Sequence, residues 1–385
     1  MKQKRNWLSS AVCLALILVM LLLPTGYENA GAGRIASEER VRARILSTDD
    51  STIKDTGLVR SGEQSCEVLL LGGSHRGETY RAYNMLNGSL EQDKVYQTGE
   101  SALVLVSLDG ASVASVSMID HYRIAGEIWL LLAFFALLML FAGWTGLRAV
   151  LSFVLSVLAI WKVLVPLCLN GMNPIFVGAV VTGGLTILII ALVFGFNKIT
   201  LAACTGAIAG LIVTAALGIV CTNAFRIHGA VMSFSESLLY SGYETLNLTQ
   251  IFMASIFIGS SGAMMDLSVD IAAAVNEVVH KRPDLSRFEA MMSGMRVGRA
   301  AMGTMTTTLL LAYSGSYIAL LMVFMAQGTP MINVFNYKYV ASEIIHTIVG
   351  SFGLVAAAPL TAAAAGFFLV KPEREESKPV PASER

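Results

Sequence analysis

IFMASIFIGSSGAMMDLSVDIAAAVNEVVHKRPDLSR, from Ile251 to Arg287, is the stretch that decides the fold of this chain. It contains most of the apolar run Leu248–Met265, which is long enough to span a bilayer. Its second half is charged but keeps a helical pattern. The stretch therefore predicts a transmembrane helix that continues beyond the membrane.

One face of this helix, at about 100° per residue, is small and acidic. Its members are Ser255, Gly259, Gly262, Ala263, Asp266, Asp270, Ala273 and Glu277. Small residues let a neighbouring helix approach closely, and deep carboxylates are costly unless they face a partner, water or an ion. At about 1.5 Å per residue, Asp266 lies about 25 Å along the span. We expect Asp266 in the cytoplasmic third of the bilayer, with Asp270 nearer water.

The next helix carries a second face of small residues, within MSGMRVGRAAMGTMTTTLLLAYSGS from Met292 to Ser316. Two small faces predict close packing of the two helices. The packing glycines are then Gly259, Gly262, Gly294, Gly298 and Gly303. Three hydroxyls, those of Thr304, Thr307 and Thr308, either line an ion path with Asp266 and Asp270 or bond to their own helix backbone. The sequence leaves both alternatives open.

A lysine lies inside another predicted span. Lys162 is eight residues before Asn170, so it either snorkels to the outer interface or pairs with a carboxylate. Glu343 opens the last span from the same side and is the candidate partner. On the same helix face lies His346, which we expect to pack or to form hydrogen bonds, although its titration range would suit a proton relay.

The composition is that of a membrane protein. The chain has 385 residues, of which 55% are hydrophobic and 14% charged, and its mean hydropathy is +0.65. Lys+Arg and Asp+Glu both total 27, so no charge excess points to nucleic acid. The five cysteines lie far apart without metal-binding spacing, and no hydrolase or nucleotide-binding motif is present. We expect neither an enzyme nor a protein with a cofactor or a metal.

About eight transmembrane helices are predicted. The first, within residues 1–24, is a signal anchor or a cleaved signal. The other seven lie within a transmembrane domain of residues 126–370, at Ile128–Ala142, Ala149–Leu169, Ile175–Phe196, Ile199–Val220, Leu248–Met265, Ala300–Met325 and Ser342–Val370. The lipid bilayer and an unknown small solute or ion are the expected partners, and homo-oligomer formation is left open.

The basic residues predict the topology. With a cytoplasmic N-terminus, alternating spans place Arg148, Lys198 and the basic residues of 281–299 inside, and only Arg226 and Lys338 outside. The tail, residues 371–385, is rich in Pro, Glu, Lys and Ser and is predicted to be disordered and cytoplasmic. The expected location is the bacterial cytoplasmic membrane.

Residues 33–123 have the composition of a soluble domain, which this topology places outside the cytoplasm. Five short runs alternate or are β-branched, at Val41–Ser47, Glu67–Leu71, Thr79–Leu86, Ala102–Leu108 and Val113–Ile119. Turn signals such as Asn87-Gly88 and Asp109-Gly110 separate them. The pattern predicts a small extracytoplasmic all-β domain, a barrel or an OB-like fold.

Several motifs support a family resemblance. They are GAMMD (Gly262 to Asp266), Asn276-Glu277, PDLS (Pro283 to Ser286), and SGMRVGR followed by GTMTTTLLLAY (Gly303 to Tyr313). The membrane half thereby resembles the YibE/F-like family of bacterial multi-pass membrane proteins. The resemblance implies a membrane protein often described as a transporter, and it brings no catalytic residues with it.

A weaker similarity links the intramembrane Asp and the threonines of the next helix to the proton-coupled half of resistance-nodulation-division and secretion accessory transporters. The chain departs from them in its small exported domain and its span count. The leading hypothesis is an ion- or proton-linked permease with its path near Asp266 and Thr304–Thr308. The alternative is a non-transporting membrane scaffold or assembly factor whose β-domain binds a partner.

Overall fold

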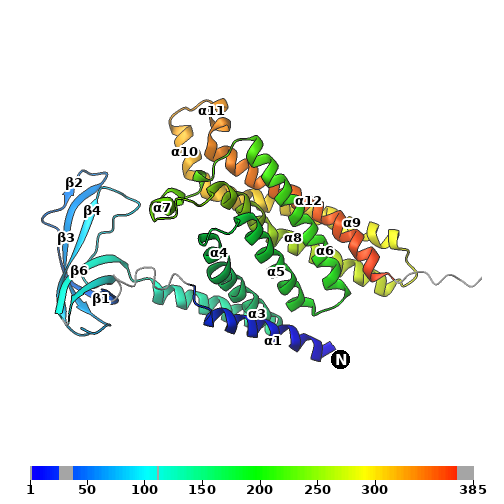
Figure 1. The fold of residues 1–385 in the computed structure, drawn as a ribbon, viewed down its shortest axis with the longest axis horizontal. Helices are drawn as coiled ribbons and strands as arrows, with labels where there is room; N and C mark the ends of the chain where they lie inside the picture. The colour runs from blue at the N-terminus through cyan, green and yellow to red at the C-terminus, as the bar shows by residue number, and fades with distance from the viewer. Residues whose placement is uncertain (1, 26–37, 111, 371–385) are drawn as a thin grey trace, which may run out of the picture. The chain divides into compact units, whose positions relative to one another are not determined.

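The computed structural model describes residues 2–25, 38–110 and 112–370, without the side chains of residues 2–9. The chain divides into two compact units, one of residues 26–141 and one of residues 1–25 and 142–385 (Figure 1). The first unit contains a β-barrel and the second a helical bundle, so each is described by itself.

The barrel consists of five strands that close on themselves. They are β1 (Glu38–Asp49), β3 (Arg60–Leu70), β4 (Thr79–Asn87), β5 (Ser101–Asp109) and β6 (Ser112–His121), with the two-residue β2 (Lys54–Asp55) beside β3. The order is β1-β5-β6-β4-β3, and β3 pairs again with β1. All pairs are antiparallel except β4 with β6. The predicted all-β barrel is confirmed.

Alternating burial explains why these runs form strands. In β1, Val41, Ala43 and Ile45 point into the barrel while their neighbours are exposed. The sequence pattern missed the first half of β3 because a polar residue, Gln64, is fully buried there. Its side chain accepts a hydrogen bond from Tyr96 N at 3.0 Å and donates one to Tyr96 O at 2.9 Å. A buried amide is tolerated because it is bonded on both sides.

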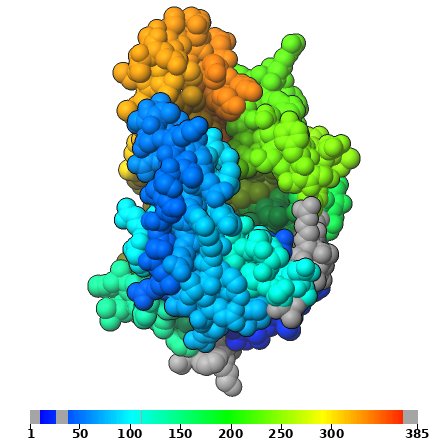
Figure 2. All heavy atoms as spheres, turned by 90° about the vertical axis from the view of Figure 1, so that its left-hand side faces the viewer, coloured from blue at the N-terminus to red at the C-terminus, as the bar shows by residue number. Residues whose placement is uncertain are grey.

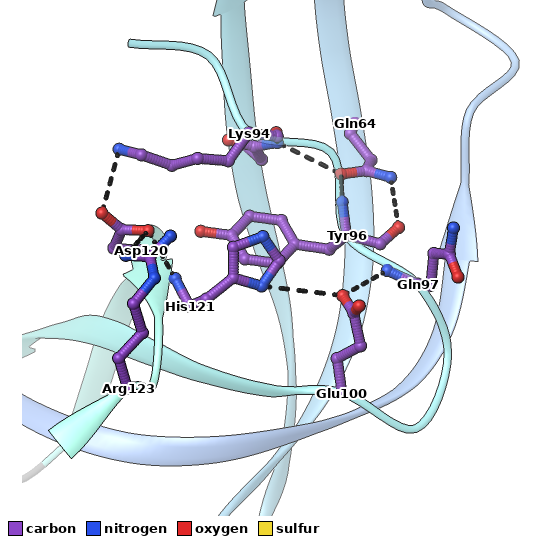
Figure 3. Close-up of polar contacts among 9 residues, drawn as sticks. Gln64, Lys94, Tyr96, Gln97, Glu100, Asp120, His121 and Arg123 are labelled. Carbon is purple, nitrogen blue, oxygen red and sulfur yellow. Dashed lines mark hydrogen bonds and ion pairs between the residues drawn. The ribbon is translucent and has the colours of Figure 1, made fainter. Parts of the chain in front are cut away.

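A polar cluster surrounds the end of β6, where the chain leads into α3 (Figure 3). The carboxylate of Asp120 accepts a hydrogen bond from His121 N at 2.7 Å and pairs with Arg123 at 2.8 Å. Lys94 lies 3.8 Å from the same carboxylate, and Glu100 lies 3.7 Å from the ring of His121. These contacts fix the last strand of the barrel to the loop that precedes β5.

Helices build the rest of the chain. They are α1 (Lys2–Leu22), α3 (Ile124–Ala159), η1 (Ile160–Leu164), α4 (Val165–Leu169), α5 (Pro174–Phe194), α6 (Lys198–Ala224), η2 (Gly229–Val231), α7 (Ser235–Tyr240), α8 (Leu248–Lys281), α9 (Arg287–Ser314), η3 (Gly315–Tyr317), α10 (Ile318–Ala326), α11 (Met331–Asn336) and α12 (Lys338–Leu369). Figure 2 shows α10 and α11 in orange as a compact lobe.

The part of the chain that the structure describes holds six helices long and apolar enough to cross a membrane, where eight were predicted. In α1, the residues whose side chains the structure describes, Ser10–Leu22, form an apolar helix shorter than a span. The two predicted spans Ile128–Ala142 and Ala149–Leu169 form one helical run, Ile124–Leu169. That run is broken at Gly143, whose φ of 53° and ψ of −126° are not helical. Glycine adopts this conformation without the steric cost of a Cβ.

The centre of the bundle is α12, which packs against α6, α8 and α9. Small residues make this arrangement possible. A Cβ added to Gly206 of α6 would lie 1.9 Å from Thr361 Oγ1, and one added to Gly353 of α12 would lie 1.6 Å from Thr214 Oγ1. The helices therefore approach to a distance at which no side chain fits.

Packing between α8 and α9 differs from the predicted contact of two small faces. Gly294 and Gly298 of α9 receive Val275 and Ile271 from the apolar face of α8, and an added Cβ would lie 2.7 and 3.0 Å from them. A large aliphatic side chain fills the hollow above a glycine better than another small residue does. The small, acidic face of α8 is consequently left largely exposed.

Candidate functional site

A cavity of about 310 Å³, with polar groups in a largely apolar wall, lies between η2, α8, α9, η3 and α12. It is lined by Val231, Met232, Phe252, Ser255, Ala312, Tyr313, Ser316, Tyr317, Ser342, Glu343 and His346. Helix α12 begins five residues before Glu343, so the cavity lies near the end of the bundle where α12 starts. Ionisable residues within membrane-spanning helices are rare, and those that line a cavity are candidates for function.

Glu343 is the acidic group of the cavity. Its Oε1 atom is buried and has no hydrogen-bond partner among the described residues. The Tyr317 side chain is close enough to interact with the carboxyl group. A buried oxygen without a donor costs free energy comparable to a lost hydrogen bond. Glu343 therefore has an unused acceptor beside the cavity.

His346 lies one turn further along α12 and is held on two sides. Its Nε2 atom is 3.2 Å from the carbonyl oxygen of Ser255 in α8. Its ring stacks on Tyr313, with centroids 4.5 Å apart and an angle of 24° between the planes. Because Nε2 faces a carbonyl, that nitrogen carries a proton and donates it.

The approach of these rings to α8 depends on Gly259. A Cβ there would lie 2.8 Å from the hydroxyl oxygen of Tyr313 and 3.2 Å from His346 Nε2. The hydroxyl of Tyr313 is itself buried without a hydrogen-bond partner among the described residues. Two buried oxygens, from Glu343 and Tyr313, are thus left unsatisfied at one site.

The predicted pair of Lys162 and Glu343 is not formed. Lys162 lies in η1, and its ammonium group donates a hydrogen bond to the carbonyl oxygen of Leu23 at 3.1 Å. Segment η1 packs against α4 and α5, whereas α12 packs against α6, α8 and α9. Lys162 and Glu343 were predicted to enter the membrane from the same side, but they belong to different parts of the bundle.

Asp266 lies on the exposed face of α8. Its position along the bundle follows from the contacts of Ser268, two residues further along the helix. Thr361 Oγ1 donates a hydrogen bond to Ser268 Oγ at 2.9 Å, and Thr361 also packs on Gly206. Gly206 is eight residues, or about 12 Å, after the start of α6 at Lys198. Asp266, two residues before Ser268, then lies about 15 Å from the level at which α6 starts.

The three candidate threonines of α9 are exposed, and their hydroxyls bond to their own helix. Thr304 donates to Ala301 O at 3.0 Å, Thr307 to Gly303 O at 3.3 Å and Thr308 to Thr304 O at 3.0 Å. Of the two alternatives that the sequence left open, the structure contains the backbone bonds. The lone pairs of these hydroxyls remain available as acceptors.

Gly262 and Gly303 were predicted to pack between helices, yet an added Cβ at either meets nothing within 4 Å. Both are exposed. The hollows on the α8–α9 interface are occupied by Ile271 and Val275, which leaves these two glycines on the outside. Asp270 is exposed on the same side of α8 as Asp266.

The small face of α8 leads from the cavity to Asp266. Ser255 borders the cavity, Gly259 lies against its rings, and Gly262 leaves open space before Asp266. From Ser255 to Asp266 is eleven residues, or about 16 Å along the helix. Between Ser255 and Asp266 this face of α8 carries only small residues, Gly259, Gly262 and Ala263.

Sequence reasoning missed the two tyrosines of the cavity. Tyr313 and Tyr317 lie one turn apart at the junction of α9 and η3, after a run of leucines that reads only as membrane-spanning. The sequence shows two tyrosines near the end of a span. This pattern is as typical of tyrosines at the membrane interface as of tyrosines that line a cavity. Only the packing of α9 on α12 brings them to Glu343 and His346.

The part of the chain that the structure describes contains no group of three or more His, Cys, Asp or Glu that could hold a metal ion. The family model described as YibE/F-like protein matches residues 130–371. No curated protein and no solved structure matches the chain.

Proposed function

This chain belongs to the YibE/F-like family, and on that premise we propose that it is an ion- or proton-linked permease of the bacterial cytoplasmic membrane and not an enzyme. The unpartnered Oε1 of Glu343 in an intramembrane cavity carries the proposal. A carboxylate oxygen that has no donor is free to accept a proton or to bind a cation.

In this proposal the small face of α8 is the ion path. Glu343 receives the ion at one end of the bundle and Asp266 of α8 receives it further along the bundle. His346 keeps the cavity end of α8 in place through Ser255 O. The threonines of α9 supply acceptor oxygens beside the path, since their protons are already donated to the backbone.

The proposed topology follows the basic residues. The barrel is outside the cytoplasm, and the segment between α8 and α9 and the C-terminus are inside. The helical run Ile124–Leu169 crosses the membrane twice in this arrangement. At about 1.5 Å per residue its 46 residues are long enough for two crossings, and the break at Gly143 supplies the reversal.

The experiment is proton flux into proteoliposomes that contain the full chain and a pH-sensitive dye, with an imposed pH gradient. Flux should be lost in both Glu343→Gln and Asp266→Asn, which keep the shape of the side chain and remove its titration. Glu277→Gln is the matched control, because Glu277 is exposed near the end of α8 and pairs with Lys281 at 3.0 Å. Its flux should equal that of the unchanged protein.

The alternative, a scaffold that binds a partner through the barrel, makes the opposite forecast. In a deletion strain, Asp266→Asn would then restore the phenotype fully at normal membrane levels, and removal of the barrel would be the damaging change. That outcome, together with proteoliposomes that show no flux above empty vesicles, would refute the permease.

A further inference from the structure

The cavity beside Glu343 is rich in acceptors. Its three serine hydroxyls each donate their proton to the carbonyl oxygen three residues earlier in the chain, Ser255 to Phe252 at 2.8 Å, Ser316 to Tyr313 at 2.9 Å and Ser342 to Tyr339 at 2.7 Å. A hydroxyl that has donated its proton offers only lone pairs to a ligand. Together with the free oxygen of Glu343, these groups favour a ligand that donates hydrogen bonds.

The charge and the aromatic rings of the cavity lining also favour a ligand that carries a positive charge. Glu343 is the one carboxylate in the lining, and neither lysine nor arginine is among the described residues that form it. The rings of Phe252, Tyr313 and Tyr317 also line it. The faces of aromatic rings attract cations, most strongly where water is excluded. A monovalent cation would therefore neutralise the carboxylate and contact the rings.

Size separates an organic cation from a bare ion. The cavity measures about 310 Å³, whereas a water molecule takes up about 30 Å³ of the liquid. A lone proton or metal ion would leave most of this space to water. A molecule of several heavy atoms with an ammonium group would fill it.

We propose that the cavity between α8, α9 and α12 binds a small primary ammonium compound, with the ammonium group on Glu343 Oε1 and its carbon chain against the aromatic rings. The inference rests on the proposed function, since it names the class of substrate. A primary ammonium has three N–H donors to match the acceptors, whereas a quaternary ammonium has none.

Binding is measured at equilibrium by isothermal titration calorimetry on the full chain in nanodiscs, without any gradient. The probes are butylammonium, tetramethylammonium and butyrate. Butylammonium should bind, tetramethylammonium should bind at least about tenfold more weakly, and butyrate should not bind. Butyrate binding as tightly as butylammonium would overturn the proposal, as would the absence of saturable butylammonium binding.

Two variants locate the binding. Glu343→Gln should weaken butylammonium at least about tenfold, which corresponds to about 1.4 kcal/mol. Ala312→Leu, which fills the cavity and keeps the carboxylate, should weaken it similarly. Glu236→Gln, in an exposed carboxylate of α7, is the control and should bind as the unchanged protein does. Unchanged binding in Glu343→Gln, with thermal melting that shows the variant folded, would refute the site.

The two proposals fail in different ways. Proton flux that needs Glu343, without binding of butylammonium, would leave the permease and remove this substrate class. Binding of butylammonium that needs Glu343, without flux in proteoliposomes, would leave the site and remove the permease.

Discussion

His346 of α12 lies between two other helices, because its ring stacks on Tyr313 at 4.5 Å and its Nε2 atom is 3.2 Å from Ser255 O. These two contacts join α12 to α9 and α8 at the edge of the cavity. The joint contains a partly buried imidazole and, beside it, a phenolic hydroxyl without a partner among the described residues.

Removing the ring of His346 should therefore destabilise the bundle. We expect His346→Ala to lower the free energy of unfolding by about 1–3 kcal/mol, the sum of an aromatic pair and a hydrogen bond. Tyr313→Phe should be neutral or slightly stabilising, because it keeps the stacked ring and removes an unsatisfied hydroxyl. Thermal melting in detergent measures both, and equal losses in the two variants would contradict this account of the hydroxyl.

The contact of α6 with α12 should not tolerate a methyl group. In Gly206→Ala the new Cβ would lie 2.6 Å from the Cα of Thr361, which is backbone and cannot rotate away. We expect a loss of about 1–3 kcal/mol, as in other overpacked cores. Gly262→Ala is the matched control in α8, with open space around the Cβ. It should be neutral or slightly stabilising in the same melting assay, since alanine favours a helix.

The polar cluster at the end of β6 should lose its stabilising effect in acid. Burial raises the pKa of Asp120, but the hydrogen bond from His121 N and the charges of Lys94 and Arg123 outweigh it, so the pKa lies below its usual value. The folded barrel thus favours the ionised form. The contribution of Asp120 to the free energy of unfolding is fully present at pH values above the pKa of an unfolded Asp, about 3.9. It is lost as the pH falls through the lower pKa of the folded state.

Asp120→Asn tests this linkage. The difference in barrel stability between the unchanged chain and Asp120→Asn, followed by hydrogen exchange of the strands, should be constant near neutral pH and shrink below about pH 4. Amide protons in β6 are the readout. A difference that persists unchanged to the lowest pH would show that the ionised carboxylate is not what stabilises the strand.

Sidedness can be tested with two engineered cysteines. Glu91→Cys, at an exposed site of the barrel, should react with an impermeant reagent from outside intact cells. Asp284→Cys, exposed between α8 and α9, should react only after the membrane is permeabilised. The unchanged chain supplies the background from its native cysteines. Labelling of Asp284→Cys in intact cells would reverse the topology.

Local patterns were enough to predict several elements. Alternation of buried and exposed residues located the strands because successive side chains point to opposite faces. The length of apolar runs located the spanning helices from α5 onward. Each of these features depends on residues a few positions apart, which the sequence shows directly.

Pairings between distant segments were not available in this way. The sequence suggested Lys162 as the ion-pair partner of Glu343, because both residues were predicted to enter the membrane from the same side. The depth of a residue along its helix does not tell which helices are neighbours. It also suggested that two small faces meet, whereas glycines of α9 accept Ile271 and Val275. Complementary shape, and not similarity of composition, selects the contact.

By itself, the sequence determined that this chain has a small β-barrel and a set of apolar helices, because periodicity and hydropathy act over short stretches. Only the tertiary structure decided that Ser255, Tyr313 and His346 border one cavity, with Glu343 Oε1 left unpaired beside it. These residues are up to 91 positions apart. They meet because α12 packs against both α8 and α9, and such packing depends on the fit of whole helix surfaces.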